Sequence, residues 1–143
     1  MFSLLLKLEP IFYNSGTMIA NELDEFSEIS FCMKGRCAIG YEINNQKRYC
    51  IKYTDNFVIG AYDLTFNKRS MFIYRSMSYI EGYFIRKQDW MELINDYSSI
   101  GLCIKRNILL NYLLKVRIKI NVHKERAMSM QKLRNDCQML KIS

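Results

Sequence analysis

The sequence has little of several residue types whose presence would mark particular classes of protein. It holds one proline and six glycines in 143 residues, which argues against a disordered or low-complexity chain. Its only histidine is His123, and its five cysteines show no metal-type spacing, so no metal site is expected. No apolar run reaches the roughly 18 residues that a membrane span needs. The longest such run, Ile108–Leu114, is interrupted by Asn111.

The chain also lacks a recognisable catalytic arrangement. No nucleophile–base pair and no carboxylate pair is placed as in an active site, and a Cys–His pair would have to use His123. We therefore expect no enzymatic activity and no cofactor. The cysteines are expected to be reduced, buried thiols in a cytoplasmic protein, although a disulfide between Cys32 and Cys37 is geometrically conceivable.

What the chain does have is a series of short segments rich in β-branched and aromatic residues. Eight of them follow one another between residues 11 and 86 at spacings of roughly 8–12 residues, a pattern typical of an antiparallel sandwich or barrel. Turns are predicted at Asn14–Gly16, Lys34–Arg36 and Asn44–Gln46. The predicted strands are Ile11–Tyr13, Met18–Ala20, Glu28–Met33, Cys37–Ile43, Arg48–Tyr53, Phe57–Ile59, Met71–Met77 and Ser78–Arg86.

Helical spacing replaces this alternation from Lys87 onward. Trp90 and its apolar neighbours fit one face of a first helix, with Trp90 as a packing anchor, and Gly101 is expected to break the chain between two helices. A second apolar face steps by four residues, and the last fifteen residues are only weakly patterned. Near the N-terminus, Leu4–Leu8 fits either a short helix or the lead-in to a strand. The second face contains Ile104, Ile108, Tyr112, Val116 and Ile120.

Charge is distributed unevenly along the chain. Residues 1–100 hold eleven Lys and Arg against twelve Asp and Glu, whereas residues 101–143 hold ten against two. We therefore divide the chain into a domain over residues 1–100 and a basic helical extension over residues 101–143. The extension is interpreted as a solvated helix face, as a segment attracted to an anionic membrane surface, or, least favoured, as a nucleic-acid contact, because no helix-turn-helix spacing follows Gly101.

The segment Asp55–Arg75 is the candidate binding site. A predicted strand ends at Gly60, a short loop follows, and Arg69 and Ser70 close it. Glycine permits close approach of a ligand, loop N–H groups form nests for anions, and arginine clamps phosphate with two charge-assisted bonds. Alternatively, the loop is purely structural, Arg69 is a surface cation and Ser70 simply begins a strand.

The succession of strands, glycine-led loop, Arg-Ser pair and helix pair resembles the cyclic nucleotide-binding domain family over residues 8–95. The segments IFYNSGTMIA, ISFCMKG, DNFVIG and EGYFIRKQDWMEL carry this resemblance. More narrowly, GYEIN, NKRSMFIY and GYFIRKQDW resemble the cytosolic domains of ciliate potassium-channel-like proteins. The resemblance implies a mainly β fold, an antiparallel β-roll with flanking helices, cAMP or cGMP as ligand, and partners that are the channel's transmembrane part or other subunits in an oligomer.

The candidate cassette departs from that family at one position in particular. Ligand-binding members carry an acid directly after the cassette glycine, and here that residue is Ala61, while Asp63 is expected to face elsewhere. Losing a hydrogen bond that involves a charged group costs about 1.5–3 kcal/mol, or roughly tenfold to a hundredfold in affinity. We therefore expect a degenerate, non-catalytic regulatory site at Gly60, Ala61, Arg69 and Ser70, over which the C-terminal segment forms a lid. The alternatives are a soluble kinase-type regulatory subunit and, with less support, a nucleic-acid-binding regulator.

Overall fold

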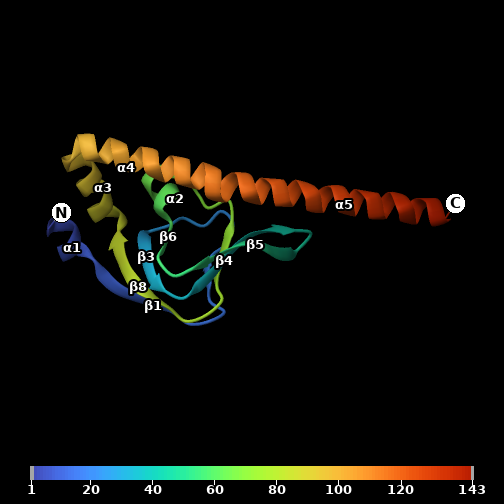
Figure 1. Cartoon of the computed structure of the whole chain (residues 1–143), viewed down its shortest axis with the longest axis horizontal. Coiled ribbons are helices and arrows are strands. Elements are labelled where there is room, and N and C mark those ends of the chain that lie inside the picture. The colour runs from blue at the N-terminus through green and yellow to red at the C-terminus, as the bar shows by residue number, and fades with distance from the viewer. Residues whose placement is uncertain (1, 143) are drawn as a thin grey trace.

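Eight strands pair into two four-stranded antiparallel sheets in the computed structural model, which describes residues 2–142 (Figure 1). The first sheet has the order β1-β8-β3-β6 and the second the order β2-β7-β4-β5. All eight predicted strands are confirmed, with ends that differ by at most two residues. The predicted antiparallel β-roll is confirmed as well. The strands are β1 (Glu9–Tyr13), β2 (Met18–Ala20), β3 (Glu28–Lys34), β4 (Arg36–Ile43), β5 (Gln46–Thr54), β6 (Phe57–Ile59), β7 (Ile73–Ser76) and β8 (Ile80–Arg86).

The turns on either side of β4 have the backbone conformations that their residues favour. Gly35, between β3 and β4, has φ of 122°, a value that L-residues with a Cβ rarely adopt. Asn44 and Asn45, between β4 and β5, have φ of 51° and 62°. Asparagine tolerates this left-handed region, and two such residues in succession form the tight turn that matches the twist of antiparallel strands. The turn at Asn44–Asn45 therefore supports the register of the β4–β5 hairpin. The turn at Gly35, expected from the sequence to close a hairpin, instead leads from the first sheet into the second, because β3 and β4 do not pair with each other.

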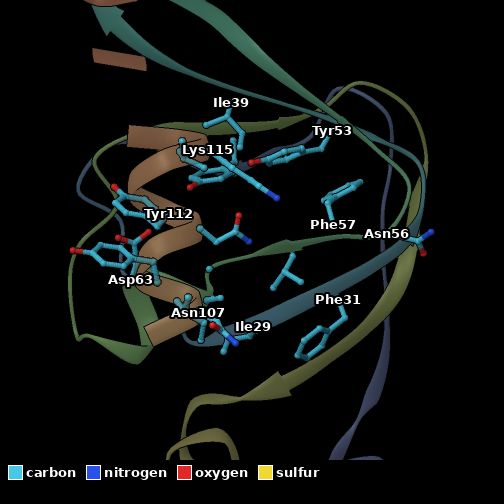
Figure 2. Close-up of a pocket in the computed structure, with 18 of the residues that line it drawn as sticks. Ile29, Phe31, Ile39, Tyr53, Asn56, Phe57, Asp63, Asn107, Tyr112 and Lys115 are labelled. Atoms are coloured by element: carbon cyan, nitrogen blue, oxygen red, sulfur yellow. The ribbon is translucent and has the colours of Figure 1, made fainter. Parts of the chain in front are cut away.

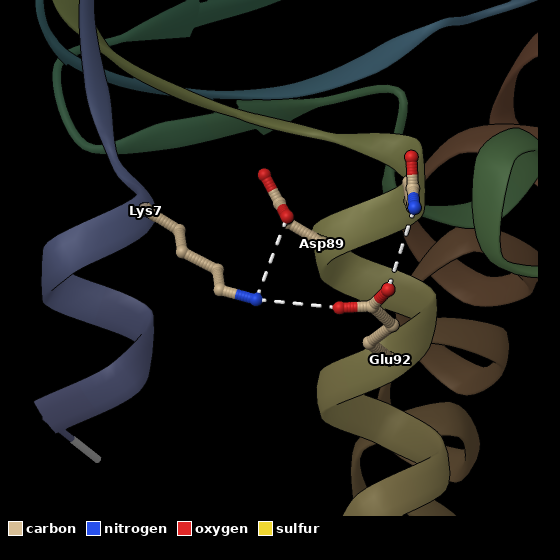
Figure 3. Close-up of polar contacts among 4 residues, drawn as sticks. Lys7, Asp89 and Glu92 are labelled. Atoms are coloured by element: carbon tan, nitrogen blue, oxygen red, sulfur yellow. Dashed lines mark hydrogen bonds and ion pairs between the residues drawn. The ribbon is translucent and has the colours of Figure 1, made fainter.

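In residues 2–142, six helical segments accompany the roll. A small N-terminal helix is tied to α3 by Lys7, whose Nζ lies 3.5 Å from Asp89 Oδ1 and 3.4 Å from Glu92 Oε2 (Figure 3). These ion pairs are exposed and contribute little to stability. The N-terminal segment, for which both a helix and the lead-in to a strand were considered, forms a helix. The segments are α1 (Phe2–Lys7), α2 (Ala61–Thr65), α3 (Lys87–Asp96), α4 (Ser98–Asn111), η1 (Tyr112–Arg117) and α5 (Ile118–Ile142).

The break between the first two C-terminal helices was predicted at the wrong residue. It falls at Tyr97, where φ is −117° and ψ is 68°, and not at Gly101, which lies inside α4. A Cβ on Gly101 would overlap the carbonyl oxygen of Ile94. Gly101 is therefore needed for the close packing of α4 on α3, which explains its presence without a helix end.

A continuous helical segment made of α4, η1 and α5 runs across the roll, and the end of α5 projects beyond it (Figure 1). Its apolar residues recur every four positions, but an α-helix turns about 100° per residue, so such a stripe drifts around the helix. The π-helical turns of η1, with their i→i+5 bonds, turn less per residue and correct the drift. Tyr112, Val116 and Ile120 consequently all remain buried against the roll.

Two apolar clusters form the core. The larger one lies between the sheets and includes Tyr112, Val116 and Ile120 from the helix. The smaller one joins β3 and β8 to α3 through Trp90, which is 6% exposed and donates from Nε1 to Thr65 Oγ1 at 2.9 Å. Trp90 is thus the packing anchor that the sequence predicted.

Two further predictions concern the cysteines and the end of the chain. Cys32 and Cys37 are buried free thiols, and burial raises the pKa of each to about 12. Cys50 is half-buried, and the expectation of burial is wrong for Cys103 and Cys137, which are exposed on the C-terminal helices. The last fifteen residues, for which frayed or helical structure was considered, continue α5 as far as Ile142. Within residues 2–142, no helix combines the length and the apolar character needed to cross a membrane.

Candidate ligand pocket

A cavity of about 430 Å³ opens between the roll and the helical segment that crosses it (Figure 2). Its floor consists of side chains from both sheets, among them Ile29, Ile39 and Phe57. Its second wall is the face of α4 and η1 that contains Ile104 and Tyr112. The cavity is thus lined by the roll on one side and by the expected lid on the other.

The start of the candidate cassette borders this cavity. Gly60 ends β6 with φ of 87°, and its carbonyl accepts the N–H of Leu64 at 3.0 Å, which starts the short helix α2. A Cβ on Gly60 would lie 2.9 Å from Phe26 Cδ1 and 3.1 Å from the carbonyl oxygen of Glu28. Gly60 and Ala61 both line the cavity. These two candidate residues therefore border the cavity, and their role in ligand binding stays a prediction.

Arg69 lies outside the lining of the cavity. Its Nη2 is 3.2 Å from Glu25 Oε1, its Nη1 is 3.4 Å from the carbonyl oxygen of Leu23, and 63% of its side chain is exposed. The guanidinium thus contacts the acidic loop between β2 and β3 instead of the pocket. The phosphate clamp that was predicted at Arg69 remains a prediction, and this geometry does not bring it together with Gly60.

Ser70 does not line the cavity either, because it is completely buried within the loop itself. Its Oγ donates to the carbonyl of Phe72 at 2.7 Å, and its backbone N–H donates to the carbonyl of Asp24 at 2.9 Å. Its own carbonyl accepts the N–H of Leu23 at 2.7 Å. These bonds give Ser70 a structural role in joining two loops, whatever its role toward a ligand.

An aromatic stack joins α2 to the crossing helix. The rings of Tyr62 and Tyr112 lie 3.8 Å apart between centroids and 3° from parallel, and Phe72 packs at 6.2 Å on Tyr112. Tyr112 is the first residue of η1 and is 6% exposed. The crossing helix and the cassette are therefore in direct contact through Tyr112.

Asp63 was expected to face away from the pocket, but it is one of the buried residues that line it. It is 3% exposed, and its Oδ1 has no hydrogen-bond partner among residues 2–142. Burial raises the pKa of this carboxyl to about 7. Burial and the nearby Asp63 together raise the pKa of Tyr112, whose buried hydroxyl likewise has no partner in the described part of the chain. The sequence carried no signal for this, because a helix of five residues shows no clear periodicity.

A polar edge on the crossing helix was also missed as part of the site. Asn107, Asn111 and Lys115 recur every four residues, line the cavity and remain exposed. The basic residues of this segment were expected to form a solvated flank, a membrane contact or, least favoured, a nucleic-acid contact. They lie at the exposed edge of the pocket because the π-helical turns of η1 change the rotation of the residues about the helix axis.

Comparison with known proteins defines the class of the fold. No family model matches the chain, and no curated protein sequence matches it. Among solved structures, a putative cyclic nucleotide-binding protein from Geobacter metallireducens superposes with a TM-score of 0.62 at 14% identity, over 77% of this chain and 79% of that one. The catabolite activator protein of Thermus thermophilus gives 0.63 at 17%, over 92% and 59%. The regulatory domain of Toxoplasma gondii PKA, solved with cAMP, gives 0.60 at 13%, over 64% and 35%.

The chain therefore has the cyclic nucleotide-binding domain fold. The sequence identities are low enough that the likeness establishes the fold alone, so the ligand and the partners have to be argued from the residues of the pocket.

Proposed function

We propose that this chain is a non-catalytic regulatory domain of the cyclic nucleotide-binding fold with a degenerate phosphate-binding cassette, which binds cAMP or cGMP weakly or not at all. The observation that carries the proposal is the position of Arg69, which pairs with Glu25 outside the pocket. Ala61 supports it, because a methyl group at that position offers no acceptor for a ribose hydroxyl. A cassette that lacks both an inward cation and an acid has lost its two charged contacts to a cyclic nucleotide.

The regulatory mechanism that we propose is coupling between the cavity and the crossing helix. Tyr62 and Tyr112 join α2 to η1, and Val116 and Ile120 continue the contact with the roll. An occupant that changes α2 changes the packing of Tyr112, and with it the preferred position of α5. A ligand shifts such an equilibrium only by its difference in affinity for the two positions.

The partners are proposed from the resemblance and from the charge of the extension. We propose a cytoplasmic module that acts on the transmembrane part of a potassium-channel-like protein or on other subunits of an oligomer. Residues 1–100 are the cyclic nucleotide-binding-like domain in this proposal, and residues 101–143 are a basic extension that is attracted to an anionic membrane surface. A kinase-type regulatory subunit is the second candidate, supported by the likeness to the Toxoplasma domain.

Titration calorimetry with cAMP and cGMP tests the degenerate cassette. We expect no heat of binding, or binding in the millimolar range, for both nucleotides. The matched variants are Arg69→Ala and Arg86→Ala, because Arg86 is a second exposed arginine, 3.3 Å from Glu9. Micromolar binding that is lost in Arg69→Ala and kept in Arg86→Ala would show a working cassette and refute the proposal.

A further inference from the structure

Lys115 supplies the pocket with a positive charge, which the cassette does not provide. It lies on η1, and Figure 2 shows its side chain extending from the helix over the cavity toward Tyr53 and Phe57. Its Nζ forms no ion pair with any residue in the described range 2–142. Asn111 and Asn107, one and two turns before it, present amide groups on the same edge of the cavity.

The other charged groups of the lining do not compensate Lys115. Asp55 lies in the turn between β5 and β6, where its Oδ1 accepts the backbone N–H of Gly35 at 2.9 Å. Asp63 is 3% exposed and lies on α2, the helix that stacks against Tyr112. The exposed end of the lining at Lys115 therefore favours an anion, and the buried end at Asp63 disfavours one.

The space between these two ends suits a flat apolar body. Tyr53 and Phe57 stack at 6.0 Å between centroids with 20° between their planes, and Phe31 and Trp90 pack at 6.4 Å further along the same cavity. Aromatic walls gain from offset stacking on a planar ligand in addition to the burial of apolar surface. Isoleucines fill the remaining floor.

We infer that the pocket binds a planar, amphiphilic organic anion, which places its apolar body among the aromatic side chains and its negative group on Lys115 at the mouth, away from Arg69. This inference deepens the proposed function and rests on it, because it gives the regulatory pocket a ligand class that needs no phosphate-binding cassette. Lysine serves here as a point charge at the end of a flexible stem, which reaches anionic groups of different shapes.

A pair of fluorescent probes tests the inference on the whole chain. The anion 8-anilinonaphthalene-1-sulfonate and its neutral counterpart N-phenyl-1-naphthylamine share the same aromatic skeleton and differ in the sulfonate. We expect Lys115→Met to lower the affinity for the sulfonate probe at least about tenfold, as the loss of a charge-assisted contact does. The affinity for the neutral probe should change less than about twofold. Lys119→Met removes the same charge from an exposed position outside the lining and should change neither affinity.

A second variant locates the probes. Ala61→Leu adds volume inside the cavity and should lower the affinity for both probes. Binding of both probes at wild-type affinity would show that they bind elsewhere and would overturn the inference. Equal affinity of the sulfonate probe for wild type and Lys115→Met, or an equal loss of both probes, overturns it as well. The calorimetry with cAMP separates the two claims, because a working cassette at Arg69 refutes the proposed function whatever the probes do.

Discussion

Replacing Asp63 with asparagine should remove a pH dependence that this buried carboxyl gives to the stability of the roll. The side chain is 3% exposed, has an unpartnered Oδ1 within the described chain and has a pKa raised from the ordinary 3.8 to about 7 by burial. Asparagine has nearly the same shape and remains uncharged at every pH. The comparison therefore isolates the ionisation of one group from its packing.

The sign follows from proton linkage. Below about pH 4 the carboxyl is protonated in the folded and the unfolded chain, and the favourable contribution of burying it neutral is fully present. Between about pH 4 and 7 the unfolded chain has released the proton and the folded chain keeps it, so the free energy of unfolding falls as the pH rises. Each pKa unit corresponds to about 1.4 kcal/mol, and the difference between 3.8 and about 7 corresponds to about 4 kcal/mol in total.

Urea unfolding at pH 5 and pH 8 measures this contribution. About 3 kcal/mol of the effect falls between these two values, so wild type should lose about that much more stability than Asp63→Asn when the pH is raised. All other ionisable groups are the same in both proteins and cancel in the comparison. Asp136→Asn serves as the control, because Asp136 is exposed on α5, and it should show the pH dependence of wild type.

Equal losses of stability by wild type and Asp63→Asn between pH 5 and pH 8 would refute this prediction. That result would mean that the carboxyl ionises in the folded chain as it does in the unfolded chain. The part of the pocket at Asp63 would then be hydrated, and an anionic ligand group would have no reason to avoid it.

Two further substitutions test the contacts around the cassette. Tyr112→Phe removes a buried hydroxyl that has no partner among the described residues and keeps the stack on Tyr62, so the urea midpoint should stay the same or rise, whereas a clear loss of stability would reveal a missed hydrogen bond. Ser70→Ala removes the bond to the carbonyl of Phe72 and should cost about 1–2 kcal/mol in the same assay. Unchanged stability together with altered probe affinity would contradict a structural role for Ser70.

The strands and the fold class could be predicted because their determinants are local. Alternation along β4 and β5 and the pair Asn44–Asn45 specify one hairpin without reference to the rest of the chain, and Gly35 specifies the turn that precedes β4. The apolar face that steps by four residues similarly predicted one helix packed on the roll. Propensity and pattern agree with the final structure in these segments, which is the condition under which local sequence is informative.

The details of the site could not be predicted, because they depend on contacts between segments distant in sequence. The direction of Arg69 is set by Glu25 and by the carbonyl of Leu23, which belong to another loop. The burial of Asp63 depends on Tyr112, forty-nine positions later. The position of Lys115 depends on the π-helical phase of η1, for which its sequence has no known signature. Tertiary contacts determine where each of these side chains lies.

The packing of the crossing helix limits which ligands the pocket can take. Val116 and Ile120 belong to the core cluster, and Tyr112 belongs both to this cluster and to the lining of the cavity. Burying one such side chain stabilises by about 1.5–3 kcal/mol, so a ligand that lifts the helix must offset roughly 5–9 kcal/mol for the three. Since about 1.4 kcal/mol is tenfold in affinity, such a ligand loses at least about a thousandfold. A flat molecule that enters beside Lys115 and slides beneath the helix avoids this loss. The core therefore selects for the ligand shape that the aromatic walls also favour.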